Sequence, residues 1–508
     1  MSYRVLHIGT ARDLKGRDRR IYRFLEILPG ALSWGTILAA VFFSWFKPIW
    51  MAVFIIAFDV YWLIKTAYLT AHLRANWKKM RHNLKIDWQK KLENLRTEHI
   101  WQMVLLPFYK EDMKVVEDTL EKILESAWPK ERMIVVLATE ARAGGYAGKT
   151  ARCLKKKYAF HFGKFLITVH PADLSGEIPG KGSNIAWAAK KAKEEIIDVL
   201  KIPYENILVS AFDVDTQVYP QYFSCLTYHF LTADYPFRSS FQPVPLYNNN
   251  IWEVPALSRV VATSGSFWQM MQQERPERLV SFSSHSLSFK ALLEAGYWQK
   301  NMVSEDSRIF WNLFFHYNGD YRIAPLSYPV SLDANVGENF WQTIKNIYKQ
   351  QRRWTWGVEN LPYLIFNCFR DKKISWRKKT RMILTQLEGY WSLPTNPLLI
   401  FFLGWLPIFL GGQEFNTTLL SYNLPLVTRA LMTIAMSGLV VSAIISTSLL
   451  PPKPRYLGKS KYIAVVIQWI IIPITIIFFG AIPGLDAQTR LLFGRYMGFW
   501  VTPKKRQH

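Results

Sequence analysis

Cysteine is scarce in this chain of 508 residues: there are three, Cys153, Cys225 and Cys368, and they lie far apart. Their scatter excludes the disulfide framework that stabilises small secreted domains, and it indicates a reducing compartment. Acidic residues are also few, with 38 Asp and Glu against 63 Lys and Arg, which gives a formal net charge of +25. An excess of this size predicts an anionic partner: nucleic acid, anionic lipid or an anionic substrate.

Nucleic acid is the least favoured of these partners, because zinc-finger spacing and the aromatic signature of RNA-binding sheets are both missing. The apolar amino-terminal sequence does not have the pattern of a cleaved signal peptide, because two apolar runs follow each other without a small-residue cleavage site between them. We therefore expect no nucleic-acid partner, and we expect the lipid bilayer to be one of the partners.

The two apolar runs cover residues 27–46 and 49–64. Each is close to the roughly 20 residues that a helix needs to cross a bilayer, so together they predict a transmembrane hairpin. Basic residues flank the pair on both sides, which places both of its ends in the cytoplasm. Asp59 falls near the inner end of the second run. Intramembrane acids can be functional, but here a carboxylate that snorkels to the interface is the better interpretation.

Two strongly basic stretches contain interleaved aromatic residues. Residues 72–100 fit either a helix at an anionic membrane surface or a solvated helical face. Residues 366–394 predict an interfacial helix.

Further apolar runs cover residues 395–410, 425–450 and 462–481. If all of them crossed the bilayer, a fifth crossing would place the following residues outside. The basic residues at 504–506 favour the inside, and we give them more weight than the number of runs.

Between the apolar regions, short strands and helices alternate. Apolar segments that predict strands cover residues 103–106, 133–137, 165–169 and 207–211. Residues 113–127 have the spacing of an amphipathic helix, and a glycine-rich turn at 180–184 opens another. This alternation predicts a parallel sheet covered on both faces, whose ligands bind at the carboxyl ends of the strands.

Asp213 and Asp215 follow directly after the predicted strand over 207–211. Two carboxylates at a strand end can share a divalent cation, and hard oxygen ligands suit Mg²⁺ or Mn²⁺ that bridges the phosphates of a nucleotide. A plain acidic turn is the alternative, but the position after a buried strand favours the metal.

Glu305 and Asp306 precede an aromatic helix. A carboxylate at this place can take a proton from an attacking hydroxyl, or it can simply stabilise a helix amino terminus. Lys181 and Asn184, in the glycine-rich turn, fit either an anion site or a helix cap. The segment 264–266 fits either an acceptor site or a buried turn.

The stretch from Gln350 to Trp354 contains an amide, two guanidinium groups and an indole. Guanidinium groups bind phosphate in a bidentate manner, and an indole is a flat surface for a sugar ring. A basic turn at a membrane surface would have the same composition.

Five motifs follow one another: Pro-x-Tyr-x-Glu at 107–111, Asp-x-Asp at 213–215, the acid pair at 305–306, Gln-x-x-Arg-Trp at 350–354 and Phe-x-Val-Thr-x-Lys at 499–504. In this order the chain resembles the membrane-embedded family-two glycosyltransferases, which include the cellulose, chitin and hyaluronan synthases. The last motif resembles the gating loop of the cellulose synthases. The resemblance implies an α/β nucleotide-sugar-binding domain of GT-A-like fold, with a mixed and mostly parallel sheet, joined to transmembrane and interfacial helices.

The resemblance assigns the residues at the donor nucleotide, which are Tyr109, Glu111, Glu140, Lys181, Asp213 and Arg353. Tyr109 and Glu111 would lie at the base, and Glu140 stands near the place where the family usually carries an aspartate on the uridine. Asp213 and Asp215 would hold Mg²⁺ or Mn²⁺. The implied donor is a nucleotide sugar, with a UDP-sugar expected first.

The same resemblance makes Asp306, beside Glu305, the general base on the acceptor hydroxyl. Gln350, Arg353 and Trp354 would hold the diphosphate and the acceptor sugar. The residues of the gating-like loop, which would close over the nucleotide, are Phe499, Val501, Thr502 and Lys504.

The implied activity is inverting sugar transfer to a growing glycan, by a processive polysaccharide synthase that couples elongation to export. A non-processive enzyme that adds one sugar to a lipid or glycan acceptor uses the same residues and is the alternative. A non-enzymatic membrane protein with a degenerate fold is a third hypothesis, and intact Asp213, Asp215, Asp306 and Arg353 argue against it.

We expect a multi-pass protein of the plasma membrane with a cytoplasmic catalytic domain. The expected regions are a basic segment and transmembrane hairpin (1–71), the catalytic domain (72–365), an interfacial helix (366–394), transmembrane helices (395–484), and an interfacial helix with the gating-like loop (485–508).

Overall fold

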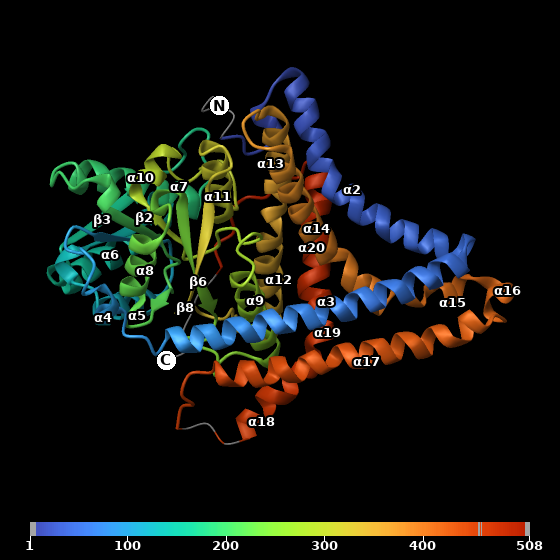
Figure 1. Ribbon diagram of the computed structural model, residues 1–508. Coiled ribbons are helices and arrows are strands. Elements are labelled where there is room, and N and C mark those ends of the chain that lie inside the picture. Colours follow the sequence, from blue (N-terminus) through green and yellow to red (C-terminus); the bar gives the residue numbers. More distant parts are fainter. Residues whose placement is uncertain (1–6, 456–457, 459, 503–508) are drawn as a thin grey trace.

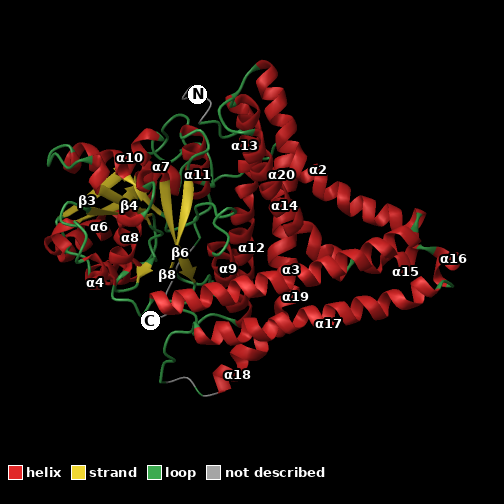
Figure 2. Ribbon diagram, viewed as in Figure 1, coloured by secondary structure: helices red, strands yellow, loops and turns green. Residues whose placement is uncertain are grey.

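A single eight-stranded sheet forms the centre of the computed structural model, which describes residues 7–455, 458 and 460–502 (Figure 2). The strand order is β3-β2-β1-β4-β7-β6-β8-β5. The strands are β1 (Trp101–Phe108), β2 (Met133–Glu140), β3 (Lys164–His170), β4 (Ile207–Ala211), β5 (Gln217–Val218), β6 (Ser239–Leu246), β7 (Ser286–Ser288) and β8 (Arg322–Ser331). The pairs among β1 to β4 and the pair β6–β8 are parallel, whereas β7 is antiparallel to both neighbours and β5 is antiparallel to β8. The predicted mixed, mostly parallel sheet is confirmed.

The four strands that the sequence predicts are β1 to β4. β1, β2 and β4 are apolar runs buried on both faces, whereas β3 is at the edge of the sheet and is partly exposed. The other four strands were not predicted. β6 contains Pro243 and Pro245, β8 contains Pro325 and Pro329, and proline is unfavourable inside a sheet. β7 consists of three residues and is mostly serine.

Helices cover both faces of the sheet (Figure 1). Because side chains alternate along a strand, Met103 and Leu105 of β1 pack on one face and Val104 and Leu106 pack on the other. The first face is covered by α7 (Lys181–Ala192), α10 (Phe289–Glu294), α11 (Glu305–His316) and α13 (Asn360–Arg370). The second face is covered by α4 (Trp88–Leu92), α5 (Met113–Glu125), α6 (Gly145–Tyr158) and α8 (Tyr222–Thr232).

Four helical stretches in the described part of the chain are long and apolar enough to cross a membrane. They are α2 (Gly16–Phe46), α3 (Pro48–Asn83), α17 (Leu419–Ser448) and the stretch Ile463–Leu492, which contains α18 (Ser460–Ile467) in part, α19 (Ile472–Ile476) and α20 (Ile482–Leu492). A fifth candidate combines α14 (Trp376–Phe401) with Leu403–Leu410, which includes α15 (Leu406–Leu410), at a bend of 46°. α16 (Gly412–Asn416) links it to α17.

The helices of this apolar part run in two directions. α3 and α17 pack side by side, and α19 and α20 lie across their direction, next to α14 and α12 (Phe340–Thr355) (Figure 1). α9 (Ala256–Gln273) packs between α3 and β6. The last apolar stretch therefore does not continue the bundle of α3 and α17. It lies beside α12 and α14, at the side of the sheet domain (Figure 1).

The expectation for Asp59 is wrong. Asp59 is 1% exposed and accepts a hydrogen bond of 2.8 Å from Thr428 of α17. It lies 11 residues after Pro48, roughly 17 Å along α3 at the usual helical rise. The sequence placed it near a helix end because the apolar run stops at residue 64, but the helix continues to Asn83.

Two predicted helices are divided. Residues 72–83 continue α3 instead of starting a new helix, and Trp88 of α4 is buried beneath the sheet domain. The stretch 366–394 is interrupted between α13 and α14, where the Asp371 carboxylate accepts hydrogen bonds from the backbone N–H of Lys373 and Ile374. This local hydrogen bonding ends one helix and turns the chain into the next.

Candidate active site

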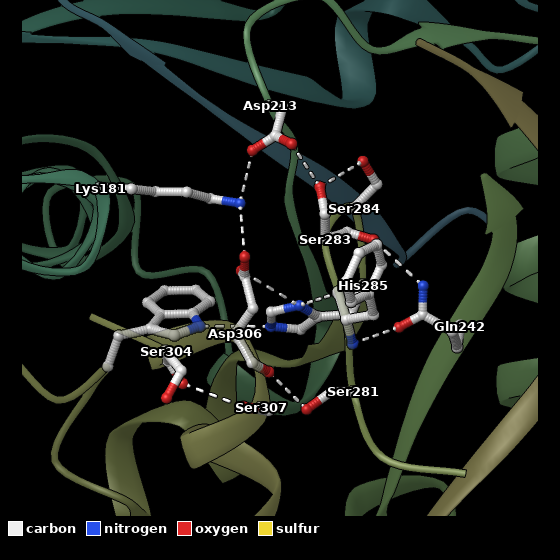
Figure 3. A network of polar contacts seen from close by, with 12 residues as sticks. Lys181, Asp213, Gln242, Ser281, Ser283, Ser284, His285, Ser304, Asp306 and Ser307 are labelled. Atoms are coloured by element: carbon white, nitrogen blue, oxygen red, sulfur yellow. Dashed lines mark hydrogen bonds and ion pairs between the residues drawn. The ribbon is translucent and has the colours of Figure 1, made fainter. Parts of the chain in front are cut away.

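Lys181, Asp213 and Asp306 meet at the carboxyl edge of the sheet (Figure 3). The ammonium nitrogen of Lys181 lies 2.8 Å from Oδ1 of Asp213 and 3.0 Å from Oδ2 of Asp306. Lys181 begins α7, Asp213 follows β4, and Asp306 is in the first turn of α11. The sequence predicted each residue as part of a site, and the structure brings the three together.

Charge and burial act in opposite directions on Lys181, which is 8% exposed. Burial disfavours the ammonium, but the carboxylates of Asp213 and Asp306 outweigh it and hold the pKa of Lys181 well above its usual range. Burial also raises the pKa of Glu305, to about 8, and the neighbouring carboxylate of Asp306 adds to the rise. At neutral pH the site therefore has a permanent cation, and the Glu305 carboxyl is mostly protonated.

Replacement of Glu305 by Gln is expected to remove part of the pH dependence of stability. The fold raises the pKa of Glu305 above its ordinary value of 4.5, so the protonated carboxyl is the form that the fold favours. The contribution of the protonated carboxyl to the free energy of unfolding is fully present below pH 4.5 and is lost as the pH rises through about 8. Thermal unfolding is measured in detergent at pH 5.5 and 8.5. The unfolding temperature of Glu305→Gln, relative to that of the wild type, should be higher at pH 8.5 than at pH 5.5.

The control for this measurement is Glu195→Gln, because Glu195 is an exposed carboxylate. Its unfolding temperature should follow that of the wild type at both pH values. A constant difference between Glu305→Gln and the wild type across the pH range would contradict the raised pKa.

Asp213 and Asp215 lie close together after β4. Oδ2 of Asp213 accepts a hydrogen bond of 2.6 Å from the hydroxyl of Ser283, and Oδ2 of the fully buried Asp215 accepts one of 2.9 Å from the backbone N–H of Asp333. Among the described residues, no group of three or more His, Cys, Asp and Glu side chains could hold a metal ion. Two carboxylates fit a cation that takes its remaining oxygen ligands from phosphates and water.

Asp306 is supported by residues that the sequence analysis missed. The hydroxyl of Ser281 donates to the Asp306 carbonyl oxygen at 2.6 Å, and His285 lies beneath the carboxylate. The side chain of Gln242 in β6 holds this segment, because its oxygen accepts from Phe282 N–H at 2.8 Å. Serine and histidine do not predict a strand, so only the run of polar residues between Phe282 and Phe289 could have drawn attention to the segment.

The turn that opens α11 is fixed by a buried glutamate, Glu359, which follows α12. One carboxylate oxygen of Glu359 accepts from the backbone N–H of Val303 at 3.2 Å, the backbone N–H of Ser304 at 2.9 Å and the hydroxyl of Ser304 at 2.6 Å. The other oxygen accepts from the Trp356 indole at 2.9 Å. Glu359 therefore holds the residues just before Glu305, and its distance along the chain hid this role from sequence reasoning.

Two predictions near α7 and α9 need correction. Asn184 is fully buried, and its amide donates to the carbonyl of Ala138 at 2.7 Å, so it ties α7 to β2 and is neither a cap nor an anion ligand. Residues 264–266 lie inside α9 and form no turn. The hydroxyl of Ser266 accepts from the backbone N–H of Tyr247 at 3.3 Å, which is a packing role.

The residues that the sequence predicts at the nucleotide base lie at the ends of β1 and β2. Glu111 accepts a hydrogen bond of 2.8 Å from the Tyr109 N–H. Glu140 forms an ion pair with Arg142, whose guanidinium carbon lies 4.5 Å from the centre of the Tyr109 ring. β1 lies between β2 and β4, so this cluster shares one edge of the sheet with Asp213. Arg142, which the sequence analysis missed, thus covers the face of the tyrosine expected at the base.

Residues 499–502 return to this edge of the sheet. The ring of Phe499 lies 4.8 Å from the Arg353 guanidinium, and a Cβ atom added to Gly180 would be 2.5 Å from Phe499 Cγ. Only glycine at position 180 permits this approach. Thr502 is buried and Val501 is half-buried, whereas Lys504 lies outside the described residues. The segment therefore lies on the sheet domain, beside the turn that carries Lys181.

Trp354 packs against Tyr247 and Phe282, with ring-centre distances of 5.6 and 5.9 Å. Together with Tyr247 and Gln350 it lines a small pocket. The side-chain oxygen of Gln350 accepts from Asn335 at 3.3 Å. The Tyr247 ring is tilted and the Phe282 ring is edge-on to Trp354, so two aromatic rings fix the indole near the carboxyl end of α12.

The segment before α2 and the first turns of α2 contact elements that carry site residues. The fully buried guanidinium of Arg308, in α11, donates to the carbonyl of Ile8 at 2.7 Å. Arg23 donates to the carbonyls of Leu491 and Leu492 at the end of α20. Just beyond, the Tyr496 hydroxyl donates to the carboxylate of Glu26 at 2.7 Å. The amino-terminal segment therefore holds both α11 and the start of the loop that carries Phe499.

The family pattern of the glycosyl transferase family group 2 matches residues 208–482, more than half of the chain. The chain belongs to this family, and it is a glycosyltransferase, with the mixed, mostly parallel sheet of a GT-A-like fold.

Two solved structures are among those similar to the chain. The mannosyltransferase PcManGT from Pyrobaculum calidifontis, in complex with GDP-Man and Mn²⁺, is 13% identical, with a TM-score of 0.39 over 83% of this chain and 99% of that one. Residues 1–349 of TarS from S. aureus, in complex with UDP-GlcNAc, are 14% identical, with a TM-score of 0.35 over 69% and 91%. A comparison with curated proteins gave no significant match.

Proposed function

We propose that the protein is an inverting transferase that moves a sugar from a nucleotide diphosphate sugar to a growing glycan, as a processive polysaccharide synthase that couples elongation to export. The observation that carries the proposal is the ion pair of Lys181 with both Asp213 and Asp306. It puts a cation for a diphosphate beside a carboxylate for a hydroxyl, at the edge of the sheet where such ligands bind.

In the proposed reaction, the acceptor hydroxyl attacks the anomeric carbon of the donor sugar while the bond to the diphosphate oxygen breaks. Asp306 takes the proton of the hydroxyl, and the nucleoside diphosphate leaves with the bonding electrons. Lys181 and Arg353 stabilise the negative charge that develops on the leaving group, which is the main electrostatic task in such a transfer. Glu305, protonated at neutral pH, does not compete for the hydroxyl proton.

Asp213 and Asp215 are the proposed ligands of Mg²⁺ or Mn²⁺, because they offer two carboxylates of hard oxygen beside the diphosphate position. When bound, the cation would neutralise charge on the donor phosphates. The Asp333 N–H and the Ser283 hydroxyl hold the two carboxylates in place.

Tyr109, Glu111 and Glu140 are proposed to hold the base, and a UDP-sugar is the donor expected first. Phe499, Val501, Thr502 and Lys504 would close over the nucleotide as a gating loop of the kind that the cellulose synthases carry. The contacts of Phe499 with Gly180 and Arg353 support this role.

Gln350, Arg353 and Trp354 are proposed to hold the diphosphate and the acceptor sugar. A non-processive transferase is the second candidate, since it needs the same groups. Processive export is favoured by the position of Trp354 on α12, whose neighbour α20 ends the last apolar stretch. We propose a multi-pass protein of the plasma membrane, with the regions 1–71, 72–365, 366–394, 395–484 and 485–508 divided as the sequence predicts and the catalytic domain in the cytoplasm.

The test is a panel of nucleotide sugars with Mg²⁺ or Mn²⁺, scored by release of nucleoside diphosphate from the purified full chain. Hexose, N-acetylhexosamine and uronic acid donors are included. Turnover with products longer than a disaccharide is the expected result. Products with one added sugar would remove processivity and leave the second candidate.

Replacement of Trp354 by Ala is expected to impair the use of the acceptor more than the binding of the donor. Loss of the stacking surface should raise the acceptor KM by about tenfold and change the donor Kd by less than about twofold. Trp376→Ala, which removes an exposed indole of α14, is the matched control. A lowered donor affinity with unchanged acceptor use would show that the stacking assignment is wrong.

A further inference from the structure

His285 lies directly beneath Asp306, and the protein fixes which of its ring nitrogens carries the proton. The side chain is fully buried. Its Nε2 lies 3.2 Å from the indole nitrogen of Trp298. An indole nitrogen can only donate, so Nε2 must accept, and the proton of the neutral ring is therefore on Nδ1.

The Nδ1–H of His285 faces two oxygens. It donates to the carbonyl of Phe282 at 2.9 Å, and Oδ1 of Asp306 lies 3.7 Å from the same nitrogen (Figure 3). Oδ1 of Asp306 is buried and has no hydrogen-bond partner among the described residues. The positive edge of the imidazole is thus the polar group that faces this oxygen.

The two oxygens of Asp306 are consequently in different environments. Oδ1 is turned inward, to His285, and Oδ2 is turned outward, to the ammonium of Lys181 at 3.0 Å. The outward oxygen is the one that an acceptor hydroxyl can reach. The orientation of the carboxylate therefore depends on what holds the inward oxygen.

The backbone next to His285 is strained, which indicates that its direction matters. Ser284 has a φ of 64°, in the left-handed region that serine rarely adopts, and it is fully buried. The strained residue separates Ser283, which donates to Asp213, from His285, which faces Asp306. One turn thus aims two side chains at the two carboxylates that bind Lys181. The His285 carbonyl is anchored to β4 by the N–H of Ala211 at 3.0 Å.

We propose that His285 is a positioning residue for Asp306: held as the Nδ1–H tautomer by Trp298, it fixes the inward oxygen so that the outward oxygen points at the acceptor hydroxyl. The inference rests on the proposed function, since it takes Asp306 as the base. The titratable groups that face the ring are Asp306 on α11, Lys181 on α7 and Asp213 after β4. Burial lowers the pKa of His285, so the ring stays neutral while it does this.

Two substitutions separate the two ring nitrogens. In His285→Asn the amide nitrogen takes the place of Nδ1, so a donor toward Asp306 is kept. In His285→Gln the amide oxygen takes the place of Nε2 and accepts from Trp298, while the N–H beside Asp306 is lost. Trp298→Phe keeps the ring of His285 and removes the indole N–H that sets its tautomer, together with part of a buried ring, so its unfolding temperature is measured beside its kcat. His316→Gln, at the far end of α11, is the matched control.

The expected result is a kcat lowered about 10- to 100-fold in His285→Gln, because a misplaced base costs this much, with the donor KM within about twofold of wild type. The acidic limb of its kcat–pH profile should move to higher pH, since the positive edge of the imidazole beside the carboxylate favours the charged form. His285→Asn should keep kcat within about threefold of wild type. Trp298→Phe should lie between the two, and His316→Gln should match the wild type.

Equal kcat values in the Asn and Gln variants, or an unmoved pH profile in the Gln variant, would overturn the proposal. A packing role is identified by two measurements, the binding of UDP and GDP by calorimetry and the unfolding temperature. If all variants lose nucleotide binding together, His285 is structural and the proposal fails. Absence of donor turnover in the wild type would instead contradict the proposed function, and the histidine variants are compared only after wild-type turnover is established.

Discussion

Asp306→Asn is expected to lower kcat by about 10²- to 10⁴-fold, the usual contribution of a general base, while the donor still binds. Asparagine keeps the size of the side chain and a contact with Lys181 through its carbonyl oxygen, but it cannot take the proton of the acceptor hydroxyl. Initial rates of nucleoside diphosphate release and calorimetric titration with UDP or GDP measure the two effects separately.

Asp320→Asn is the matched control for this variant, because Asp320 is an exposed carboxylate just beyond the far end of α11, where it pairs with Arg238. Its kcat should equal that of the wild type. Unchanged turnover in Asp306→Asn would remove Asp306 as the base and leave Glu305 as the next carboxyl to examine.

Lys181→Met is expected to lower kcat/KM for the donor by about 10²- to 10³-fold, because a preorganised charge is removed from the position of the leaving group. Methionine fills the aliphatic space but leaves the carboxylates of Asp213 and Asp306 facing each other without a cation. Repulsion between like charges should also reduce the unfolding temperature. Steady-state kinetics over a range of donor concentrations, and thermal unfolding, are the measurements.

Lys190→Met serves as the control, since Lys190 is on the exposed side of the same helix and its nearest carboxylate, Glu194, lies 4.0 Å away. It should change neither quantity. A normal kcat/KM in Lys181→Met would show that the ion pair is structural and that the Lys181 ammonium does not contact the diphosphate.

The first half of the sheet could be predicted because β1, β2 and β4 are buried on both faces and read as continuous apolar runs. β6 and β8 could not, because their prolines argue against strands, yet the two pair in parallel across an irregular register between Gln242 and Val244. The position of Asp59 was predicted wrongly because the end of an apolar run is not the end of the helix that contains it: α3 continues to Asn83.

The site could be predicted as a set of residue types and not as an arrangement. The motifs identify Lys181, Asp213 and Asp306, but only the fold shows that one ammonium contacts both carboxylates. Glu359 and His285 contact the residues of the candidate site, and neither belongs to a sequence motif. They are recognised only from the contacts they make.

The contacts of the amino-terminal segment mean that the catalytic unit cannot be excised as a water-soluble fragment beginning near residue 100. Such a fragment would deprive the Arg308 guanidinium of the Ile8 carbonyl, and it would release the end of α20 and Tyr496 from Arg23 and Glu26. The helix that carries Asp306 and the loop that carries Phe499 would each lose an anchor. A transfer of the sheet domain to another protein would therefore have to include α2 and the residues before it.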